Sequence, residues 1–346
     1  MGLFSSADNK YLGIDIGDSS LKMVELTKKG KKIILSNYGL ADSIPNFRFS
    51  QSSDVDHLAR SIMKMKKELG IKTNKATVSL SSFSVFSSVI NINNYDKKRL
   101  DERVMEEAKK VVPLPLSEMV LDWKIIPNKE GENSNNIKIF LTGSPKKLVK
   151  KYIDVFKQTG IYLSNLETET FSLIRSLLGE DSSSVMIIQM GANSTNFSIV
   201  KDSIPFLNRS INISGKTITA QISEKMGIDV EQAEQFKFDL SVSDMSKGGE
   251  IPKVIFNAIE PIIVEIKYML DLFSNSGGGN IEKIILSGGG SLLFNLDKYL
   301  ENYVNIKTII GDPWFRVVCP RELKPILDQM GPKLGVAVGL ALRGIE

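Results

Sequence analysis

Two short segments of this 346-residue chain have nearly the same pattern, although they lie about half the chain apart. Residues 12–26 read LGIDIGDSSLKMVEL, and residues 187–200 read IIQMGANSTNFSIV. Each pattern predicts a strand, a tight turn of glycine and small polar residues, and a returning strand. Such a turn exposes backbone N–H groups and hydroxyls in a concavity that suits phosphate oxygens. One copy alone is most simply an ordinary β-hairpin, but two matched copies predict a duplicated fold that closes on one phosphate chain from both sides.

A third segment completes this set. Residues 284–293 read IILSGGGSLL, which predicts an apolar strand, three glycines and the start of a helix. Glycines at such a place let the backbone approach a flat ligand closely, and the following helix N-terminus faces that ligand. A glycine-rich turn alone is weak evidence for a ligand, because tight turns also need glycine. In their order along the chain, however, the three segments resemble the phosphate 1, phosphate 2 and adenosine motifs of the actin-like ATPases.

A closer resemblance extends over the whole chain. Segment 111–123 reads VVPLPLSEMVLDW and is similar to a signature of the PilM family of type IV pilus assembly proteins. Further segments agree with this family: 160–178, GIYLSNLETETFSLIRSLL; 229–237, DVEQAEQFK; 311–317, GDPWFRV; and 335–344, GVAVGLALRG. The resemblance implies an α/β fold of the actin-like ATPase type. Its duplicated ribonuclease-H-like domains would carry an inserted subdomain of the 1C type, as in the division protein FtsA.

The resemblance and the predicted elements divide the chain into three parts. Residues 1–86 and 162–184 are expected to form the first actin-like domain (subdomain 1A), and residues 87–161 the inserted 1C-type subdomain. Residues 185–346 are expected to form the second domain (2A/2B), with a C-terminal helix near 334–345 packing back toward the first. The patterns predict strands at 12–17, 21–27, 32–40, 76–80, 120–126 and 137–142, a polar hairpin loop at 129–136, and helices at 54–69, 96–110, 216–227, 230–237 and 251–273.

The cofactors that the resemblance implies are ATP and Mg²⁺. Strand alternation places Asp15 on the glycine side of its strand, where a carboxylate holds Mg²⁺ through water. Lys22 would supply a point charge to the phosphates, or else be a solvated strand residue. Glu234 and Lys237 lie three apart on one helix face, which fits either a nucleotide-lining pair or an exposed ion pair. The full expected nucleotide set is Gly17, Asp18, Ser19, Ser20, Lys22, Gly191, Asn193, Ser194, Thr195, Gly215, Lys216, Glu234, Lys237, Gly288, Gly289, Gly290 and Ser291.

One position departs from the pattern of related families. They usually carry Asp at the start of the phosphate 2 motif, where this chain has Gln189. An amide adds no negative charge and is a poor general base. Glu169 matches a glutamate that lies near the attacking water in relatives, so it is the candidate catalytic residue, although a helix-capping role fits it nearly as well. We therefore expect nucleotide binding with slow or absent hydrolysis, the nucleotide acting mainly as an ordering ligand.

The resemblance also implies a partner. A PilM-like chain would hold the N-terminal cytoplasmic tail of an inner-membrane PilN-like protein, alongside other pilus machine components and with self-association open. Docking is expected in a groove beside the strands of the inserted subdomain, with apolar, proline-stiffened wall residues: Val111, Val112, Pro113, Leu114, Pro115 and Leu116.

Other interpretations stay open: an FtsA-like division filament, the PilM-like component of a type II secretion system, and a sugar or acetate kinase. FtsA-like proteins end in an amphipathic membrane helix, whereas this chain ends in GLALRGIE, which favours the PilM-like interpretation. The kinase is least favoured, because no polar substrate constellation or Asp base for a hydroxyl acceptor stands out.

Composition fits a cytoplasmic protein, and the resemblance implies that it reaches the inner membrane face through its partner. At 42% hydrophobic residues the chain can bury two large cores, and no apolar run approaches the length of a membrane helix. The single cysteine, Cys319, excludes a disulfide framework, and the lone His57 cannot build a usual metal site. The net charge of +4 is spread too evenly to indicate nucleic acid. Residues 1–6 fit the N-myristoylation pattern, which we discount because the resemblance is to a prokaryotic family.

Overall fold

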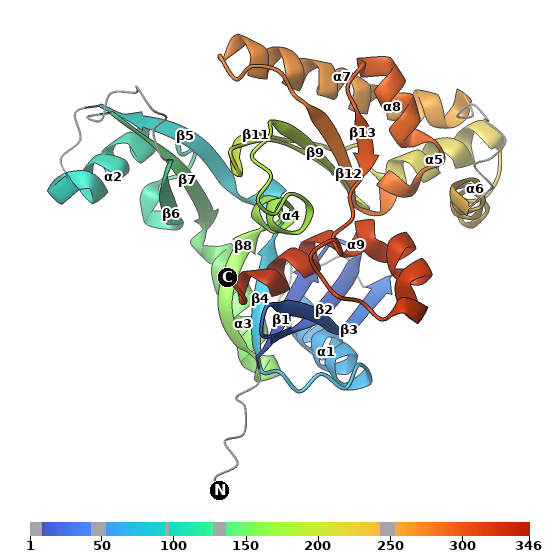
Figure 1. Ribbon diagram of the computed structural model, residues 1–346, viewed down its shortest axis with the longest axis horizontal. Helices are drawn as coiled ribbons and strands as arrows, with labels where there is room; N and C mark the ends of the chain where they lie inside the picture. Colours follow the sequence, from blue (N-terminus) through green and yellow to red (C-terminus); the bar gives the residue numbers. More distant parts are fainter. Residues whose placement is uncertain (1–8, 43–52, 94–96, 127–135, 243–252) are drawn as a thin grey trace, which may run out of the picture.

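The computed structural model describes residues 9–42, 53–93, 97–126, 136–242 and 253–346. Within these ranges the chain forms two five-stranded sheets, one three-stranded sheet and helices that pack on them (Figure 1). The predicted myristoylation pattern at 1–6 and most of the predicted loop at 129–136 lie outside the described residues.

The first sheet has the strand order β3-β2-β1-β4-β8. Its first three strands run antiparallel, and β4 and β8 continue the sheet in parallel with β1. Leu12 and Ile14 share one buried face with helices α1 and α3, whereas Val24 and Leu26 pack against α9 on the other face. The elements are β1 (Lys10–Ile16), β2 (Ser20–Lys29), β3 (Lys32–Asp42), α1 (Ser53–Glu68), β4 (Lys75–Leu80), α3 (Lys146–Thr159), β8 (Tyr162–Thr168) and α9 (Lys324–Arg343).

The second sheet repeats this layout with the order β11-β10-β9-β12-β13. Its central strand is buried on both faces: Met186 and Ile188 pack under α5, α7 and α8, whereas Val185 and Ile187 face α4 and α9. Helices α4 and α9 thus fill the space between the two sheets (Figure 1). The elements are α4 (Glu169–Leu177), β9 (Val185–Met190), β10 (Thr195–Lys201), β11 (Ile204–Ile211), α5 (Gly215–Met226), α6 (Val230–Val242), α7 (Lys253–Asn275), β12 (Lys283–Ser287), η5 (Gly289–Leu292), α8 (Leu296–Val304), β13 (Thr308–Ile310) and η6 (Arg321–Leu323).

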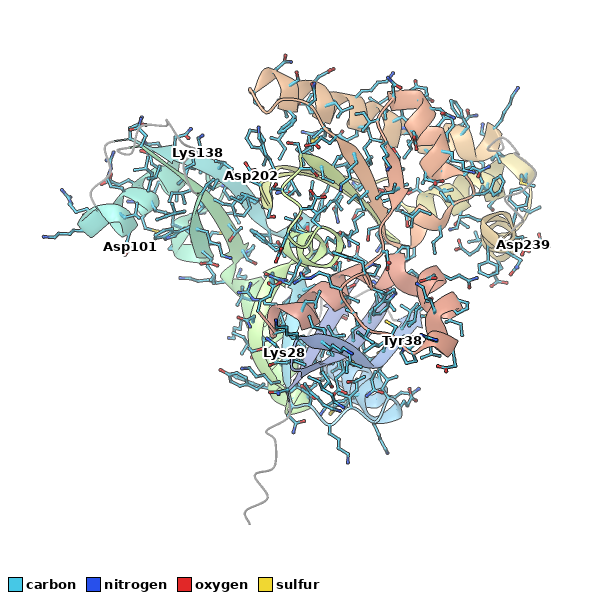
Figure 2. All side chains as sticks on the ribbon, in the orientation of Figure 1. Lys28, Tyr38, Asp101, Lys138, Asp202 and Asp239 are labelled. Atoms are coloured by element: carbon cyan, nitrogen blue, oxygen red, sulfur yellow. The ribbon has the colours of Figure 1, made fainter. Side chains whose placement is uncertain are left out.

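The third sheet has the order β5-β7-β6 and carries helix α2 on one face. Ile139 and Leu141 of the central strand are fully buried against Val104 and Ala108 of α2. The elements are η1 (Ser82–Ser84), β5 (Phe86–Ile92), η2 (Lys97–Arg99), α2 (Leu100–Val111), η3 (Leu116–Glu118), β6 (Met119–Ile126) and β7 (Ile137–Pro145). We call the part from β5 to β7 the inserted subdomain. Asp101 on its helix and Asp239 on α6 lie at opposite ends of the molecule (Figure 2).

Two predicted boundaries need correction. The range 87–161 includes α3, but Tyr152, Val155 and Phe156 of this helix are buried in the core of the first sheet. Helix α3 therefore packs with the first sheet and not with the inserted one. The C-terminal helix begins at Lys324, not near 334, and Pro332 lies inside it. It does contact β1, β2 and β4, and Gly13 is required there because a Cβ would stand 2.2 Å from the carbonyl oxygen of Ala337.

Candidate functional site

The two turns have the same hydrogen bond at the same place. In the first, the N–H of Gly17 donates to the carbonyl of Ser20 over 2.9 Å, and in the second, the N–H of Gly191 donates to Ser194 over 2.9 Å. A Cβ on either glycine would stand close to that carbonyl oxygen, at 3.3 Å in the first turn and 3.1 Å in the second. Both turns thus favour glycine for the same local reason.

The side chains next to the turns form matched sets in the two sheets. Asp15 pairs across the strands with Lys22, and at the equivalent register Gln189 pairs with Asn196. The neighbouring parallel strand supplies a serine in each sheet: Ser79 donates to Asp15, and Ser287 lies beside Gln189. The duplicated positions therefore hold a carboxylate and an ammonium group in the first sheet and two amides in the second.

Asp15 is buried, and each of its carboxylate oxygens already has a donor. Lys22 Nζ lies 2.8 Å from Oδ2, and the Ser79 hydroxyl lies 2.8 Å from Oδ1. Burial alone would lower the pKa of Lys22, but the charge and hydrogen bond of Asp15 outweigh it, so the pKa is raised and the lysine stays cationic. Lys22 is thus neither a solvated strand residue nor a free point charge, because it is paired with Asp15.

Glu169 lies between the two sets. It is the first residue of α4 and is 7% exposed. Its Oε2 accepts the backbone N–H of Ser82 over 3.0 Å and the Asn196 amide over 3.4 Å. Burial, then the charge of Asp15, raises the pKa of Glu169 to about 7, although the Ser82 N–H and Lys22 act in the opposite direction. A carboxyl with a pKa near neutral pH can both accept and release a proton there, which suits general acid–base chemistry.

The second turn is hydrogen-bonded to the start of α5. The N–H groups of Gly215 and Lys216 donate to the carbonyls of Gly191 and Ala192, so the helix start is fixed to the turn. Asn193 in this turn has a buried Nδ2 with no hydrogen-bond partner among the described residues, an atom that a phosphate or ribose oxygen would satisfy. Thr195 is fully buried, and its hydroxyl donates to the carbonyl of Ile213 over 2.7 Å, so this hydroxyl is engaged within the protein.

The predicted pair on α6 reaches back to the same helix start. Lys237 Nζ donates to Glu234 over 2.6 Å, to the Thr219 hydroxyl over 2.7 Å and to the carbonyl of Gly215 over 3.2 Å. Burial would raise the pKa of Glu234, but hydrogen bonds from Lys237 and Thr219 lower it overall, so Glu234 is ionised. These two residues form a partly enclosed ion pair next to the second turn.

The three glycines after β12 differ in what requires them. A Cβ on Gly288 would stand 2.4 Å from the carbonyl oxygen of Met190, and one on Gly290 would stand 2.7 Å from the Met190 Cβ. Only Gly289 among the three has no close backbone neighbour, and it is exposed. Packing on Met190, and not a flat ligand, therefore explains two of the glycines.

Ser291 also departs from the prediction. It is fully buried, and its hydroxyl closes the turn onto Gly288 over 2.7 Å. Sequence reasoning missed Lys333 of α9, whose side chain lies 3.6 Å from the position of a Cβ on Gly289 and whose charge acts on Glu234. No local motif marks it, because it comes to the site through the fold of α9.

The set of residues fits a nucleotide with a hydrated metal. The two turns offer backbone N–H groups, Asn193 offers an unsatisfied donor, and Asp15 offers oxygens that can accept from metal-bound water. Over the described ranges no group of three His, Cys, Asp or Glu side chains forms a metal site of its own. Mg²⁺ here would depend on phosphate oxygens and water for most of its ligands.

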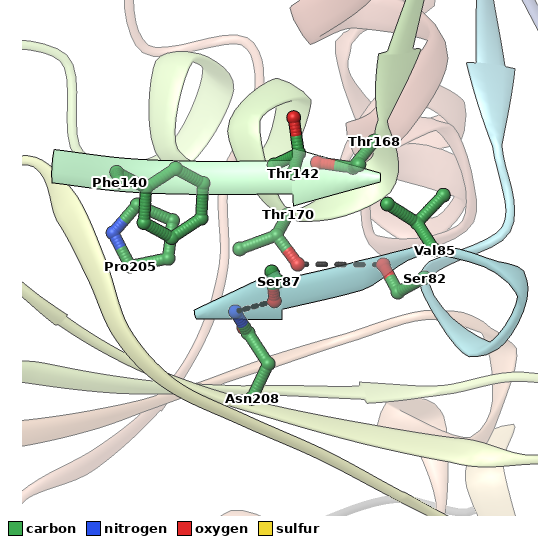
Figure 3. Close-up of a pocket in the computed structure, with 9 residues that line it drawn as sticks. All are labelled: Ser82, Val85, Ser87, Phe140, Thr142, Thr168, Thr170, Pro205 and Asn208. Carbon is green, nitrogen blue, oxygen red and sulfur yellow. Dashed lines mark hydrogen bonds between the residues drawn. The ribbon is translucent and has the colours of Figure 1, made fainter. Parts of the chain in front are cut away.

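Two cavities lie on the other side of Glu169, at the base of the inserted subdomain. The smaller has a volume of about 20 Å³ and is shown in Figure 3, where Ser82 points toward Thr170 and Asn208 toward Ser87. The larger has a volume of about 330 Å³ and lies between η1, β5, β10 and β11. Strands β5 and β11 are both edge strands of their sheets. The larger cavity is lined by Ser82, Phe83, Val85, Phe86, Ser87, Asn196, Phe197, Ser198, Asn208, Arg209 and Ser210.

The predicted groove wall at 111–116 is only partly a surface. Val111 and Leu114 are 39% and 44% exposed, and both prolines are exposed. Val112, however, is buried in the core of the inserted subdomain, and Leu116 packs against that core. These two residues hold the turn in place and do not form a wall.

Comparison with known proteins identifies the family. The sequence pattern of the family described as "Type IV pilus assembly protein PilM" matches residues 13–345. The chain belongs to the PilM family. FtsA of Enterococcus faecalis is 22% identical over 289 residues, which are 76% of this chain and 66% of that protein, so the chain covers less than two thirds of this relative.

Solved structures confirm the actin-like fold that the motifs predict. A PilM-PilN type IV pilus biogenesis complex matches with a TM-score of 0.82 at 24% identity, covering 97% of this chain and 98% of the other. MreB5 of Spiroplasma citri bound to ADP matches with a TM-score of 0.53 at 13% identity, covering 96% and 94%. None of the helices within the described ranges has the length and apolarity needed to cross a bilayer.

Proposed function

We propose that this protein is an ATP-binding adaptor of the type IV pilus machinery, which holds the cytoplasmic tail of an inner-membrane PilN-like protein. The observation that carries nucleotide binding is the pair of matched turns, together with the unsatisfied Nδ2 of Asn193 between them and α5. MreB5, which shares the fold, was solved bound to ADP. The protein would act in the cytoplasm and reach the inner membrane only through its partner, without nucleic acid.

The proposed nucleotide site uses only part of the predicted set. The N–H groups of Gly17 and Gly191 close the turns, so backbone N–H groups of Asp18, Ser19 and Ser20 in the first turn, and of Ser194 in the second, would contact the phosphates. Glu234, Lys237 and Lys333 would line the ribose and base together with Gly289. Asp15 would hold Mg²⁺ through water.

Slow or absent hydrolysis is part of the proposal. The Gln189 side chain is uncharged, and its Oε1 accepts a hydrogen bond from Asn196 Nδ2 over 3.4 Å. Glu169, with a pKa raised to about 7, stays the candidate base in this group, so the proposed slow hydrolysis rests on Gln189. Nucleotide would therefore act mainly by ordering the two halves of the molecule.

A titration with Mg·ATP tests the nucleotide site. Binding stabilises the folded state by mass action, so the wild-type melting temperature should rise with ligand concentration. Gly289→Leu should remove this rise, because its side chain enters the open side of the turn without a backbone clash. The matched control is Glu224→Leu, which adds the same side chain at an exposed position near the C-terminal end of α5. No rise at millimolar ATP in the wild type would contradict the proposal.

For the partner, we propose that an extended tail peptide docks on the inserted subdomain. The larger cavity suits such a peptide, because edge strands β5 and β11 carry unpaired backbone groups and aromatic Phe83 and Phe86 offer apolar contact. The exposed Val111 and Leu114 offer a second apolar surface on the same subdomain. We place the main anchor in the cavity, because an enclosed pocket supplies more affinity than an open turn.

Charge introduction separates these surfaces. Phe83→Asp at the cavity should abolish binding of the tail peptide, Leu114→Asp should weaken it less, and Val264→Asp on the outer face of α7 should leave it intact. All three positions are exposed, at 66%, 44% and 62%, so the fold should tolerate each change. Binding that survives Phe83→Asp but is lost in Leu114→Asp would move the anchor to the proline-paired turn.

The limits of the domains and the alternative functions are also proposals. The first actin-like domain would comprise residues 1–86 with 146–184, the inserted subdomain residues 87–145, and the second domain residues 185–346. The alternative functions are a role in type II secretion and an FtsA-like filament with self-association. The identity of the membrane protein that co-purifies with the chain would distinguish these functions from the pilus adaptor.

A further inference from the structure

The inserted subdomain joins the first sheet through two connections, which we call the stems. The first stem is residues 81–85, between β4 and β5, and contains the turn η1. The second is the direct passage from β7, which ends at Pro145, into α3, which begins at Lys146. Neither stem has a loop longer than a few residues, so a shift of the subdomain must move both.

The first stem is bonded to the carboxylate between the two turns. The backbone N–H of Ser82 donates to Glu169 over 3.0 Å, and its hydroxyl shares a hydrogen bond with Thr170 over 3.3 Å. Ser82 also lines both cavities on the other side. One residue of this stem therefore touches Glu169 and the cavities at once.

The second stem reaches the same carboxylates through Tyr152 of α3. This side chain is 4% exposed and packs in the core that contains Ile14 and Ile16 of β1, directly before the first turn. Burial raises the pKa of Tyr152, and the charges of Glu169, Asp15 and Asp18 raise it further, which agrees with its packing beside β1. Both stems thus lead to the region of Asp15 and Glu169 from the same end of the inserted sheet, where Phe86 of β5 pairs with Gly143 of β7.

The second sheet is also tied to the inserted one. Asn208 of β11 donates to Ser87 of β5 over 3.1 Å, and Thr170 shares a hydrogen bond with Ser198 of β10 over 3.2 Å. Relative movement of the two large sheets is therefore transmitted to the wall of the larger cavity.

We propose that the two stems couple the nucleotide phosphates to the inserted subdomain, so that nucleotide binding changes the position of β5 and the shape of the larger cavity. Mg·ATP at the turns changes the charge beside Asp15 and Glu169, and Glu169 must then shift or change its protonation. Either response alters its bond to Ser82 and the field at Tyr152. This inference rests on the proposed nucleotide site and concerns how that site is read out.

Hydrogen exchange of the full chain, with and without saturating Mg·ATP, tests the coupling. In the wild type, nucleotide should slow exchange in peptides that cover β5 and β6 by about fivefold or more, the lower end of ordinary coupling between sites. Tyr152→Phe removes the phenol hydroxyl, and Ser82→Ala removes the hydroxyl that bonds Thr170 next to Glu169, while the backbone bond of Ser82 to Glu169 stays. Both variants keep the packing, and each should reduce this slowing while ATP affinity stays close to wild type. Tyr162→Phe, at a position 69% exposed on β8, is the control and should behave as wild type.

Two results would overturn the inference. One is nucleotide binding, seen as a rise in melting temperature, without any change of exchange in β5 and β6. The other is the same slowing in the wild type, Tyr152→Phe and Ser82→Ala. A wild-type protein whose melting temperature does not respond to Mg·ATP would instead refute the proposed nucleotide site itself, and the coupling with it.

Discussion

Replacing Glu169 by Gln should make the protein more stable at alkaline pH and leave it nearly unchanged in acid. Gln keeps an oxygen that can accept from the Ser82 N–H, but it cannot ionise. The wild-type carboxyl has its pKa raised from 4.5 to about 7 by burial and the nearby Asp15. The folded state therefore favours the protonated form.

The sign and size follow from that shift. Below pH 4.5 both the folded and the unfolded chain carry the proton, so Glu169 has no pH-dependent effect. As pH rises toward 7, the unfolded chain releases the proton first, and the free energy of unfolding falls. At about 1.4 kcal/mol per pKa unit, the full shift amounts to about 3 kcal/mol of lost stability above pH 8, which is an upper value because neighbouring groups adjust.

Urea denaturation of both proteins between pH 5 and pH 9 measures this difference. The difference between the two free energies of unfolding should be smallest near pH 5, at about 1 kcal/mol or less, and should grow until about pH 8, with Glu169→Gln the more stable at pH 9. Glu118→Gln, on the exposed turn η3, serves as the control and should follow the wild type throughout. A difference in the free energy of unfolding that is the same at all pH values would contradict the raised pKa of Glu169, because a packing change alone does not follow the titration of this carboxyl.

Three further changes have defined outcomes. Gly288→Ala should lower the free energy of unfolding by about 1–3 kcal/mol in a urea titration, because φ is +80° there and the new Cβ would meet the Met190 carbonyl. No change in the free energy of unfolding would mean that the turn relaxes to accept the side chain. Glu167→Ala should cost about 3–5 kcal/mol, because this buried carboxylate binds Arg175 and Arg343, and exposed Glu102→Ala should cost little by the same assay. Gln189→Asp should raise the rate of phosphate release without much change in ATP affinity. An unchanged rate, together with loss of activity in Glu169→Ala, would assign control of the water to Glu169 alone.

The sequence predicted the elements whose pattern is local. Strands β1, β2, β4 and β6 and helix α1 fall within two residues of their predicted limits, because alternation or helical periodicity marks both their faces. The predicted helix 96–110 starts instead at Leu100, after a short 3₁₀ turn, and strand β11 escaped prediction because its segment IPFLNRSI is half-buried without a regular alternation.

The candidate site was only partly accessible to sequence reasoning. The matched turns are contiguous motifs, so their place could be predicted, but the roles of Thr195 and Ser291 depend on contacts with Ile213 and Gly288 that no spacing reveals. Lys333 and Tyr152 come from helices that fold back from elsewhere in the chain, so no motif around them marks a site. The same holds for the pairing of Lys22 with Asp15, which needs the register of two strands.

We propose above that the protein, ordered by nucleotide, holds the tail of a membrane partner. The most direct test of this proposal is the affinity of the full chain for a synthetic peptide of the PilN-like protein's N-terminal tail, measured by calorimetry with and without saturating Mg·ATP. We expect the peptide to bind in both conditions and more tightly with nucleotide. Phe83→Asp should abolish binding of the peptide, and Val264→Asp should not. No heat of binding in either condition, from a protein whose melting temperature does rise with Mg·ATP, would contradict the adaptor role.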